Sequence, residues 1–208
     1  MTVSGKVGLL CPFKNKDGKI VGLQIRPDEQ GESKYVWLSC SKHHMGGVGI
    51  GGDGGLPAHV SRPAELRDSR IYITEGPIKA DIASDIFGAV VIAIPGISTW
   101  ESAGVLGIIN DQRPNEVVIA YDSEKNKHTR VQERKLATAL SVVGYNVYLA
   151  KWEEAEGKGI DDLLLRGGRP IINRWEHRLA DEDNRQISLK RVIEIPAAAV
   201  PKTENVEP

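Results

Sequence analysis

The fold of this 208-residue chain is decided by IYI at residues 71–73, VVIAI at 90–94 and VVIAY at 117–121. Each run has the length and composition of a strand that is buried on both faces. The segments between the runs have helical periodicity, and short turn motifs close each run. The pattern therefore predicts an α/β fold in which helices connect the strands of a parallel sheet.

Three acidic residues follow these runs. Glu75 comes shortly after the first run, and Asp122 and Glu124 come at the end of the third. Because ligands of parallel sheets bind at the carboxyl ends of the strands, we expect the three carboxylates to share one edge. Carboxylates that converge repel one another unless a cation neutralises them, and such hard oxygen ligands select Mg²⁺ or Mn²⁺.

Each acid taken alone has a simpler explanation, as a helix cap or a salt-bridge partner. It is their joint placement that favours a metal site. Two divalent ions about 4 Å apart can clamp the attacking and leaving oxygens of a phosphoryl displacement. The acids therefore point first to a reaction on a polynucleotide.

The order of these motifs resembles the TOPRIM domain, which DnaG-type primases share with type IA and type II topoisomerases and certain nucleases. The resemblance covers roughly residues 70–166, as strand, Glu-Gly, helix, strand, Pro-Gly, helix, strand and Asp-x-acid. It implies a metal-dependent phosphoryl-transfer site. Glu75 matches the family's glutamate, a general acid or base or a metal ligand, and Asp122 and Glu124 match its Asp-x-Asp metal ligands. Glu124 departs from that pattern by one methylene group.

The front of the chain is predicted to form a small β-rich subdomain. Residues 7–13 and 19–26 flank an Asp-Gly turn signal and indicate a hairpin, and residues 34–39 indicate a third strand. This stretch resembles the one that precedes the TOPRIM core of DnaG-type primases, where a small basic subdomain faces template and nucleotide. The resemblance implies that Arg26 and Lys34 contact phosphates, although both also fit a solvated loop.

Two helices are predicted between the strands. A helix that starts at Pro77 should pack on the sheet through Ile78, Ile82 and Ile86, which recur at four-residue spacing. The motif STWE at 98–101 fits a capping box, so a second helix should begin there.

A third helix is predicted between Asn126, as its cap, and Gly144, as its stop. Its buried stripe should consist of Leu136, Ala139, Leu140 and Val143. A fourth strand is predicted at residues 145–152.

Basic residues near the acids are candidate phosphate contacts. Lys79 lies one turn after Glu75, where it would either hold a phosphate or neutralise the acids. Lys127 and Arg130 lie near the start of the third helix, where a solvated face is the simpler interpretation.

The segment GKGIDDLL at residues 157–164 resembles the one that follows TOPRIM cores in primases. By that resemblance Asp161 is an additional metal ligand and Lys158 a contact for nucleic acid or nucleotide. Asp162 would equally serve as a cap of the helix that follows.

Residues 46–55 contain seven glycines but no Gly-Lys-Ser/Thr, so they predict a mobile loop and not a P-loop. His43 and His44 precede this loop and His59 follows it, so a histidine metal site is possible. Adjacent residues of a strand point to opposite faces, so we expect surface placement or DNA contact for them in place of a metal site.

Four segments are predicted along the chain. They are the β-rich subdomain (1–69), the TOPRIM core (70–167), a helical or irregular extension (168–195) and a tail of linker composition (196–208). Proteins with this combination look like the uncharacterised TOPRIM-type domain of phage, plasmid and mobile-element replication proteins, which is often fused to a helicase.

The composition excludes several classes of protein. A hydrophobic content of 40% supports a proper core, and the net charge is only −1. The two cysteines, Cys11 and Cys40, cannot build a disulfide framework or a four-cysteine zinc ribbon. No apolar run approaches the about 20 residues that span a bilayer. We expect a cytoplasmic protein with no membrane partner.

Primer synthesis by a DNA primase is the leading functional hypothesis. Its partners would be a single-stranded DNA template, nucleoside triphosphates and a helicase domain or subunit, with Mg²⁺ or Mn²⁺ as cofactor. One alternative is a TOPRIM nuclease that directs water at a phosphodiester. The other is a non-catalytic module that binds nucleic acid or nucleotide within a replication complex.

Overall fold

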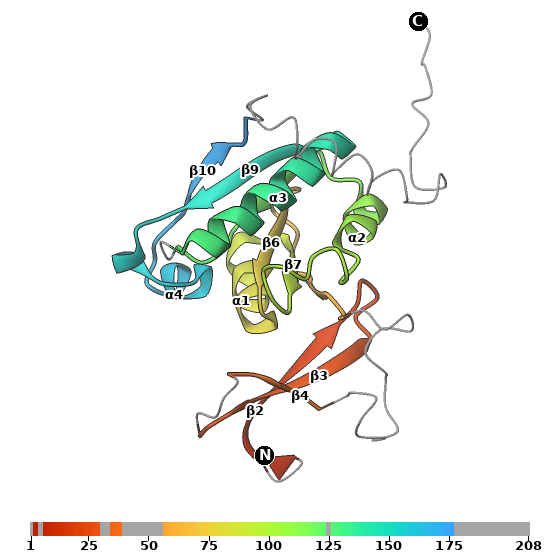
Figure 1. The fold of residues 1–208 in the computed structure, drawn as a ribbon, viewed down its shortest axis with the longest axis vertical. Coiled ribbons are helices and arrows are strands. Elements are labelled where there is room, and N and C mark those ends of the chain that lie inside the picture. The colour runs from red at the N-terminus through yellow and green to blue at the C-terminus, as the bar shows by residue number, and fades with distance from the viewer. Residues whose placement is uncertain (1, 4–5, 30–33, 39–55, 124–125, 177–208) are drawn as a thin grey trace, which may run out of the picture.

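The structure is a computed structural model that describes residues 2–3, 6–29, 34–38, 56–123 and 126–176. Glu124, Cys40, the histidine pair, the glycine-rich segment and the tail lie outside these ranges. The described residues form two sheets with helices packed on the larger one (Figure 1).

The larger sheet has six strands in the order β10-β9-β8-β6-β7-β5. In chain order they are β5 (His59–Ser61), β6 (Ile71–Glu75), β7 (Val90–Ile94), β8 (Glu116–Ile119), β9 (Asn146–Lys151) and β10 (Ile171–Arg174). The four inner strands are parallel, and β5 and β10 pair antiparallel at the two edges. This confirms the predicted fold class, an α/β fold with a mostly parallel sheet flanked by helices.

The helices cover both faces of this sheet (Figure 1). They are α1 (Pro77–Phe87), α2 (Val105–Gln112), α3 (Lys127–Val143) and α4 (Ile160–Leu165), with a short 3₁₀ turn at Glu154–Glu156. Helices α2 and α3 share one apolar core with Ile73 and Ile119, while α1 and α4 share the other with Tyr72 and Val118. The alternation of side chains along β6 and β8 supplies both cores, which is why these strands are apolar throughout.

Helix α1 packs on the sheet through a different face from the one predicted. Its buried residues are Pro77, Ala80, Ala83 and Ser84. The predicted residues Ile78 and Ile82 are only partly buried. Small side chains at three-residue spacing let the helix approach the strands closely, and the Ser84 hydroxyl is satisfied by donating to the carbonyl of Ala89 (2.7 Å).

The second helix was predicted to begin directly after Ser98, which is wrong, because α2 begins at Val105. The intervening residues form turns, with the Ala103 N–H donating to Thr99 and the Val105 N–H to Trp100. These turns bury the indole of Trp100 in the core, and Gly104, at φ 65°, redirects the chain into the helix.

The third helix has the predicted ends. The Asn126 side chain accepts from the His128 N–H, and Gly144 ends α3 in the left-handed region. Val143, however, is 39% exposed. The buried stripe instead continues toward the start of the helix through Thr129 and Glu133.

The smaller sheet contains β1 (Thr2–Val3), β2 (Lys6–Lys14), β3 (Ile20–Pro27) and β4 (Val36–Trp37), all antiparallel. The predicted hairpin is therefore present. Its turn is held by the Asn15 side chain, which accepts from the backbone of Asp17 and Lys19. The third predicted strand is reduced to the two residues of β4.

A buried histidine ties the two sheets together. His59 of β5 is fully buried, and its Nδ1 accepts from the backbone N–H of Lys14 on β2 (3.0 Å). Its Nε2 lies 3.0 Å from Asp81 Oδ1 on α1. Because a backbone N–H already donates to Nδ1, the proton must sit on Nε2 and point to Asp81. Burial raises the pKa of Asp81, but hydrogen bonds from His59 and Ser61 outweigh it and hold that pKa below its ordinary value.

Within the described part of the chain, each helix is too short or too polar to cross a bilayer.

We expect His59→Leu to destabilise the protein by about 2–4 kcal/mol, because the Lys14 N–H would lose its acceptor at a fully buried side chain and Asp81 would lose one of its two donors. Urea unfolding followed by circular dichroism measures this change. Ser61→Ala is the matched control, since it removes another donor to Asp81 without unpairing the Lys14 amide, and it should cost about 1 kcal/mol. Equal costs for the two variants would show that His59 does not tie the sheets.

Candidate functional site

Two of the predicted acids lie at the carboxyl ends of neighbouring strands. Glu75 is the last residue of β6, and Asp122 follows β8. These strands are parallel with Ile73 opposite Ile119, and the Ala120 N–H extends the ladder by donating to the Ile73 carbonyl (2.8 Å). Strand order thus brings together acids that are far apart in the sequence.

Lys79 lies between these two acids. Its ammonium donates to Asp122 Oδ1 and lies 4.0 Å from Glu75 Oε1. The side chains of Lys79, Glu75 and Asp122 are 19%, 27% and 8% exposed. Both carboxylates therefore contact one largely buried cation, which offsets their mutual repulsion.

Asp161 approaches the same lysine from α4. A Cβ atom placed on Gly159 would overlap Asp161 Oδ1 and lie 2.9 Å from Lys79 Cε, so these side chains meet over the glycine. Asp161 Oδ1 is buried and has no hydrogen-bond partner in the described part of the chain. Asp162 accepts from the Gly159 N–H (3.4 Å), which fits the role of a helix cap.

The loop before α4 is fastened to the loop after β8. Ser123 donates its N–H to the Lys158 carbonyl (3.0 Å) and its hydroxyl to the Gly157 carbonyl (3.0 Å). The Trp152 indole also donates to the Gly157 carbonyl (2.8 Å). Lys158 is consequently held, exposed, beside the chain that follows Asp122.

The carboxylate oxygens at this edge are of the chemical type that a hard divalent cation prefers as ligands. Glu75 and Asp122 are carboxylates that already share a positive charge, and Asp161 adds a buried carboxylate oxygen that lacks a hydrogen-bond partner among the described residues. Within the same ranges no three His, Cys, Asp or Glu side chains are grouped closely enough to hold a metal. Glu124, the remaining predicted ligand, lies outside those ranges.

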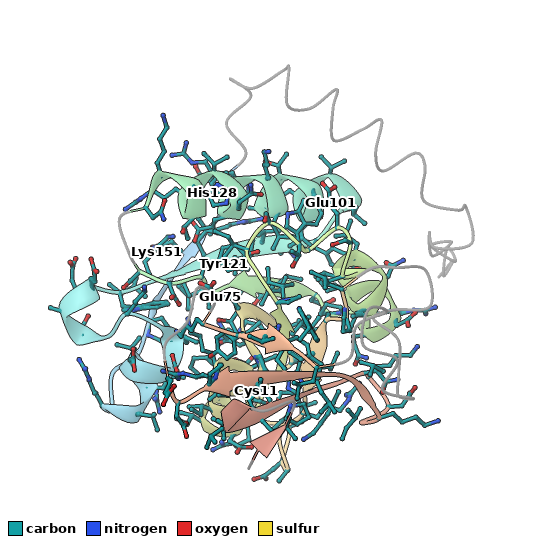
Figure 2. The ribbon with its side chains drawn as sticks, turned by 60° about the horizontal axis from the view of Figure 1, so that its bottom comes forward. Cys11, Glu75, Glu101, Tyr121, His128 and Lys151 are labelled. Carbon is teal, nitrogen blue, oxygen red and sulfur yellow. The ribbon has the colours of Figure 1, made fainter. Side chains whose placement is uncertain are left out.

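Sequence reasoning missed a second cluster at this edge. Tyr121 is buried beside Glu75, and burial first, then the charges of Glu75 and Glu133, raise the pKa of its phenol. Glu133 of α3 is buried and accepts from Lys151 of β9 through both oxygens (2.5 and 2.7 Å). Figure 2 labels Glu75, Tyr121 and Lys151, which lie at or just beyond the ends of β6, β8 and β9. The sequence signal that could have revealed this cluster is Glu133, an acid on the apolar stripe of the predicted third helix.

Tyr35 brings the small sheet within electrostatic reach of the acidic edge. Burial raises the pKa of this half-buried phenol, while the charges of Arg26 and Lys79 lower it and that of Asp161 raises it. The Lys34 ammonium lies 5.7 Å from the centroid of the Tyr35 ring. Arg26 and Lys34 are both exposed.

Lys127 and Arg130, the remaining candidates for nucleic-acid contact, are also exposed, in the first turn of α3. The structure therefore places them at the surface, on the helix that follows Asp122 in the chain.

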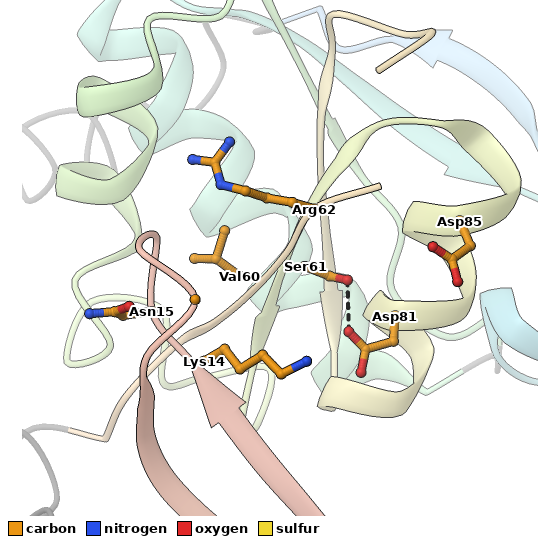
Figure 3. Close-up of a pocket in the computed structure, with 8 residues that line it drawn as sticks. Lys14, Asn15, Val60, Ser61, Arg62, Asp81 and Asp85 are labelled. Atoms are coloured by element: carbon orange, nitrogen blue, oxygen red, sulfur yellow. Dashed lines mark hydrogen bonds between the residues drawn. The ribbon is translucent and has the colours of Figure 1, made fainter. Parts of the chain in front are cut away.

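A cavity of about 440 Å³ lies away from the acidic edge, where the hairpin meets α1 and β5 (Figure 3). It is lined by Lys14, Asn15, Gly18, Val60, Ser61, Arg62, Asp81 and Asp85. None of the predicted site residues that the structure describes contributes to it.

The fold is similar to that of primase catalytic cores. The "zinc binding and RNA polymerase domains" of the Aquifex aeolicus primase share 18% identity and a TM-score of 0.51 over 88% of this chain and 40% of theirs. A DnaG primase catalytic domain bound to single-stranded DNA shares 16% identity and a TM-score of 0.52 over 86% of this chain and 52% of its own. The E. coli primase catalytic core shares 16% identity and a TM-score of 0.50 over 88% of this chain and 52% of its own. This chain thus spans about half the length of these structures, and the likeness is one of fold.

The chain belongs to the family described as Domain of unknown function (DUF3854), which matches residues 65–171. A comparison with curated proteins gave no match.

Two glycines of the loop before α4 should respond differently to alanine. Gly157→Ala should cost about 2 kcal/mol, because its Cβ would lie 2.6 Å from the backbone nitrogen of Leu163. Gly159→Ala should cost less than about 1 kcal/mol, since it displaces only the ends of two flexible side chains, but it should move Lys79 away from Asp122. Urea unfolding and a crystal structure of Gly159→Ala test this. A larger cost at Gly159, or an unmoved Lys79, would contradict it.

Proposed function

We propose that Glu75 and Asp122 belong to a TOPRIM-type site that catalyses metal-dependent phosphoryl transfer on nucleic acid, as primer synthesis by a DNA primase-like nucleotidyltransferase. The observation that carries the proposal is the meeting of these two carboxylates around a cation at neighbouring strand ends. Parallel α/β sheets bind their ligands at this edge. The primase-like fold supports the same conclusion.

Mg²⁺ or Mn²⁺ bound to Glu75, Asp122, Glu124 and Asp161 would neutralise charge on the reacting phosphate and lower the pKa of the attacking hydroxyl. In primer extension the 3′-hydroxyl oxygen bonds to the α-phosphorus of a nucleoside triphosphate, and the bond to the departing pyrophosphate breaks. The hydroxyl proton passes to a base. Glu75 is the candidate for that base because it is partly exposed at the edge, whereas Asp122 is nearly buried.

The basic residues around the edge would hold the polyanionic substrates. Arg26 and Lys34 lie beside Tyr35, which is within electrostatic reach of Lys79 and Asp161, so a template strand on the small sheet would pass next to the acids. Lys158 would contact the substrate from the opposite loop, and Lys127 and Arg130 from α3.

A helicase partner, a mobile-element setting, a cytoplasmic location and the four sequence segments belong to this proposal as predictions from the sequence. The large sheet extends beyond the predicted limits of the core segment, residues 70–167. Its two edge strands, β5 and β10, lie outside these limits in the sequence.

Incubation with single-stranded DNA, labelled nucleoside triphosphates and Mn²⁺ should give oligonucleotides that disappear with EDTA. Glu75→Gln and Asp122→Asn should each lower the yield by about a hundredfold or more, since each removes a charge that the reacting centre needs. Glu65→Gln, at an exposed acid before β6, is the control and should leave the yield unchanged. Shortened template in place of new oligonucleotides would identify a nuclease, and binding without turnover would identify a non-catalytic module.

The small sheet should contribute to the salt dependence of DNA binding. For single-stranded DNA, removing one phosphate contact lowers the slope of log K against log salt by about 0.7, so Arg26→Ala with Lys34→Ala should flatten it by roughly one to one and a half. Sequence preference should not change, since phosphates carry none. Fluorescence anisotropy across a salt series measures the slope. Lys135→Ala with Arg169→Ala removes two exposed charges elsewhere and should leave it unaltered. An unchanged slope in the first variant would remove the small sheet from the binding surface.

A further inference from the structure

Lys79 is held in a fitted position between the acids. The turn before α1 places it, because Gly76, at φ 80°, donates its N–H to the Ile94 carbonyl (2.9 Å) and Pro77 starts the helix. The lysine is then one turn beyond Glu75, within 4.0 Å of its carboxylate. The same short motif therefore supplies an acid of the proposed site and a positive charge beside it.

Helix α4 leaves room for the same side chain. Gly159 has no Cβ, and one placed there would come within 3.1 Å of the Lys79 ammonium. The ammonium thus lies among Glu75, Asp122 and the glycine, and Asp161 Oδ1 lies over the same side of that glycine. Only 19% of the lysine side chain is exposed, so solvent screens its charge weakly.

A divalent cation bound by both carboxylates would need the place that this ammonium takes. An ammonium that donates to Asp122 competes for the same oxygen lone pairs, and its charge would repel an incoming cation. While Lys79 is present, its charge already offsets the repulsion between the two carboxylates, so a metal is not needed to neutralise them. A metal must therefore displace the lysine before it can bind both acids.

We propose that Lys79 is a built-in competitor of the divalent ion, which neutralises the acids in the metal-free protein and lowers their affinity for metal. This inference rests on the proposed function, because it concerns the same carboxylates. Metal binding and the Lys79–Asp122 contact are then mutually exclusive, and the apparent dissociation constant rises with the fraction of protein in which the lysine is in place.

Titration calorimetry with Mn²⁺ alone tests the competition without any measurement of turnover. Lys79→Met keeps the length of the side chain but not its charge, and it should bind Mn²⁺ roughly tenfold more tightly than the wild type. Lys79→Arg keeps the charge and should bind like the wild type. Lys135→Met, at an exposed lysine of α3, controls for net charge and should also bind like the wild type.

Thermal unfolding supplies a second readout, which also shows whether each variant folds. Without metal, Lys79→Met should melt several degrees below the wild type because its two acids repel each other. Saturating Mn²⁺ should close most of this gap, so that the metal stabilises the variant more than the wild type. Adding Asp122→Asn to Lys79→Met should remove the extra stabilisation.

The outcomes separate this inference from the function on which it rests. Equal or weaker Mn²⁺ binding by Lys79→Met, with measurable binding by the wild type, would overturn the competition and leave the proposed metal site intact. Absence of Mn²⁺ binding in the wild type and in every variant would overturn both.

Discussion

Two carboxylates at the ends of adjacent strands repel each other, and the structure meets this constraint with a lysine ammonium. Several features of the fold follow from it. The order of β6 and β8 brings the acids together, the turn at Gly76 starts α1 where Lys79 reaches them, and Gly159 leaves space on the opposite side. The acidic edge is thus built from three separate segments around one positive charge.

The rest of the molecule holds that edge in place. Both faces of the large sheet are buried by helices, so its strands cannot shift in register without exposing apolar side chains. His59 fixes the small sheet to β5 and α1 through hydrogen bonds at both ring nitrogens. Tyr35, which precedes β4 of the small sheet, is within electrostatic reach of Lys79 and Asp161.

The strands and most helices could be predicted because their signals are local: apolar runs for β6 to β8, and Asn126 and Gly144 for the ends of α3. What failed depends on packing. The three-residue strand β5 is too short to show a hydrophobic period. Burial of Trp100 in the core accompanies turns where the capping motif predicted a helix. In α1 the small residues face the sheet in place of the isoleucines. Likewise, the sequence indicated that Glu75 and Asp122 meet and that Lys79 would either hold a phosphate or neutralise the acids. The choice between these two roles and the pair Glu133–Lys151 depend on distances between elements.

Helix α1 carries two contacts that lie only two positions apart. Lys79 reaches the acidic edge, and Asp81 receives the hydrogen bond of His59. A helix is stiff over so short a distance because consecutive hydrogen bonds fix its backbone. Any rotation of α1 that strains the junction with the hairpin must therefore also move the ammonium among the carboxylates. In mechanical terms the helix is a lever between the junction with the small sheet and the charge balance at the ends of β6 and β8.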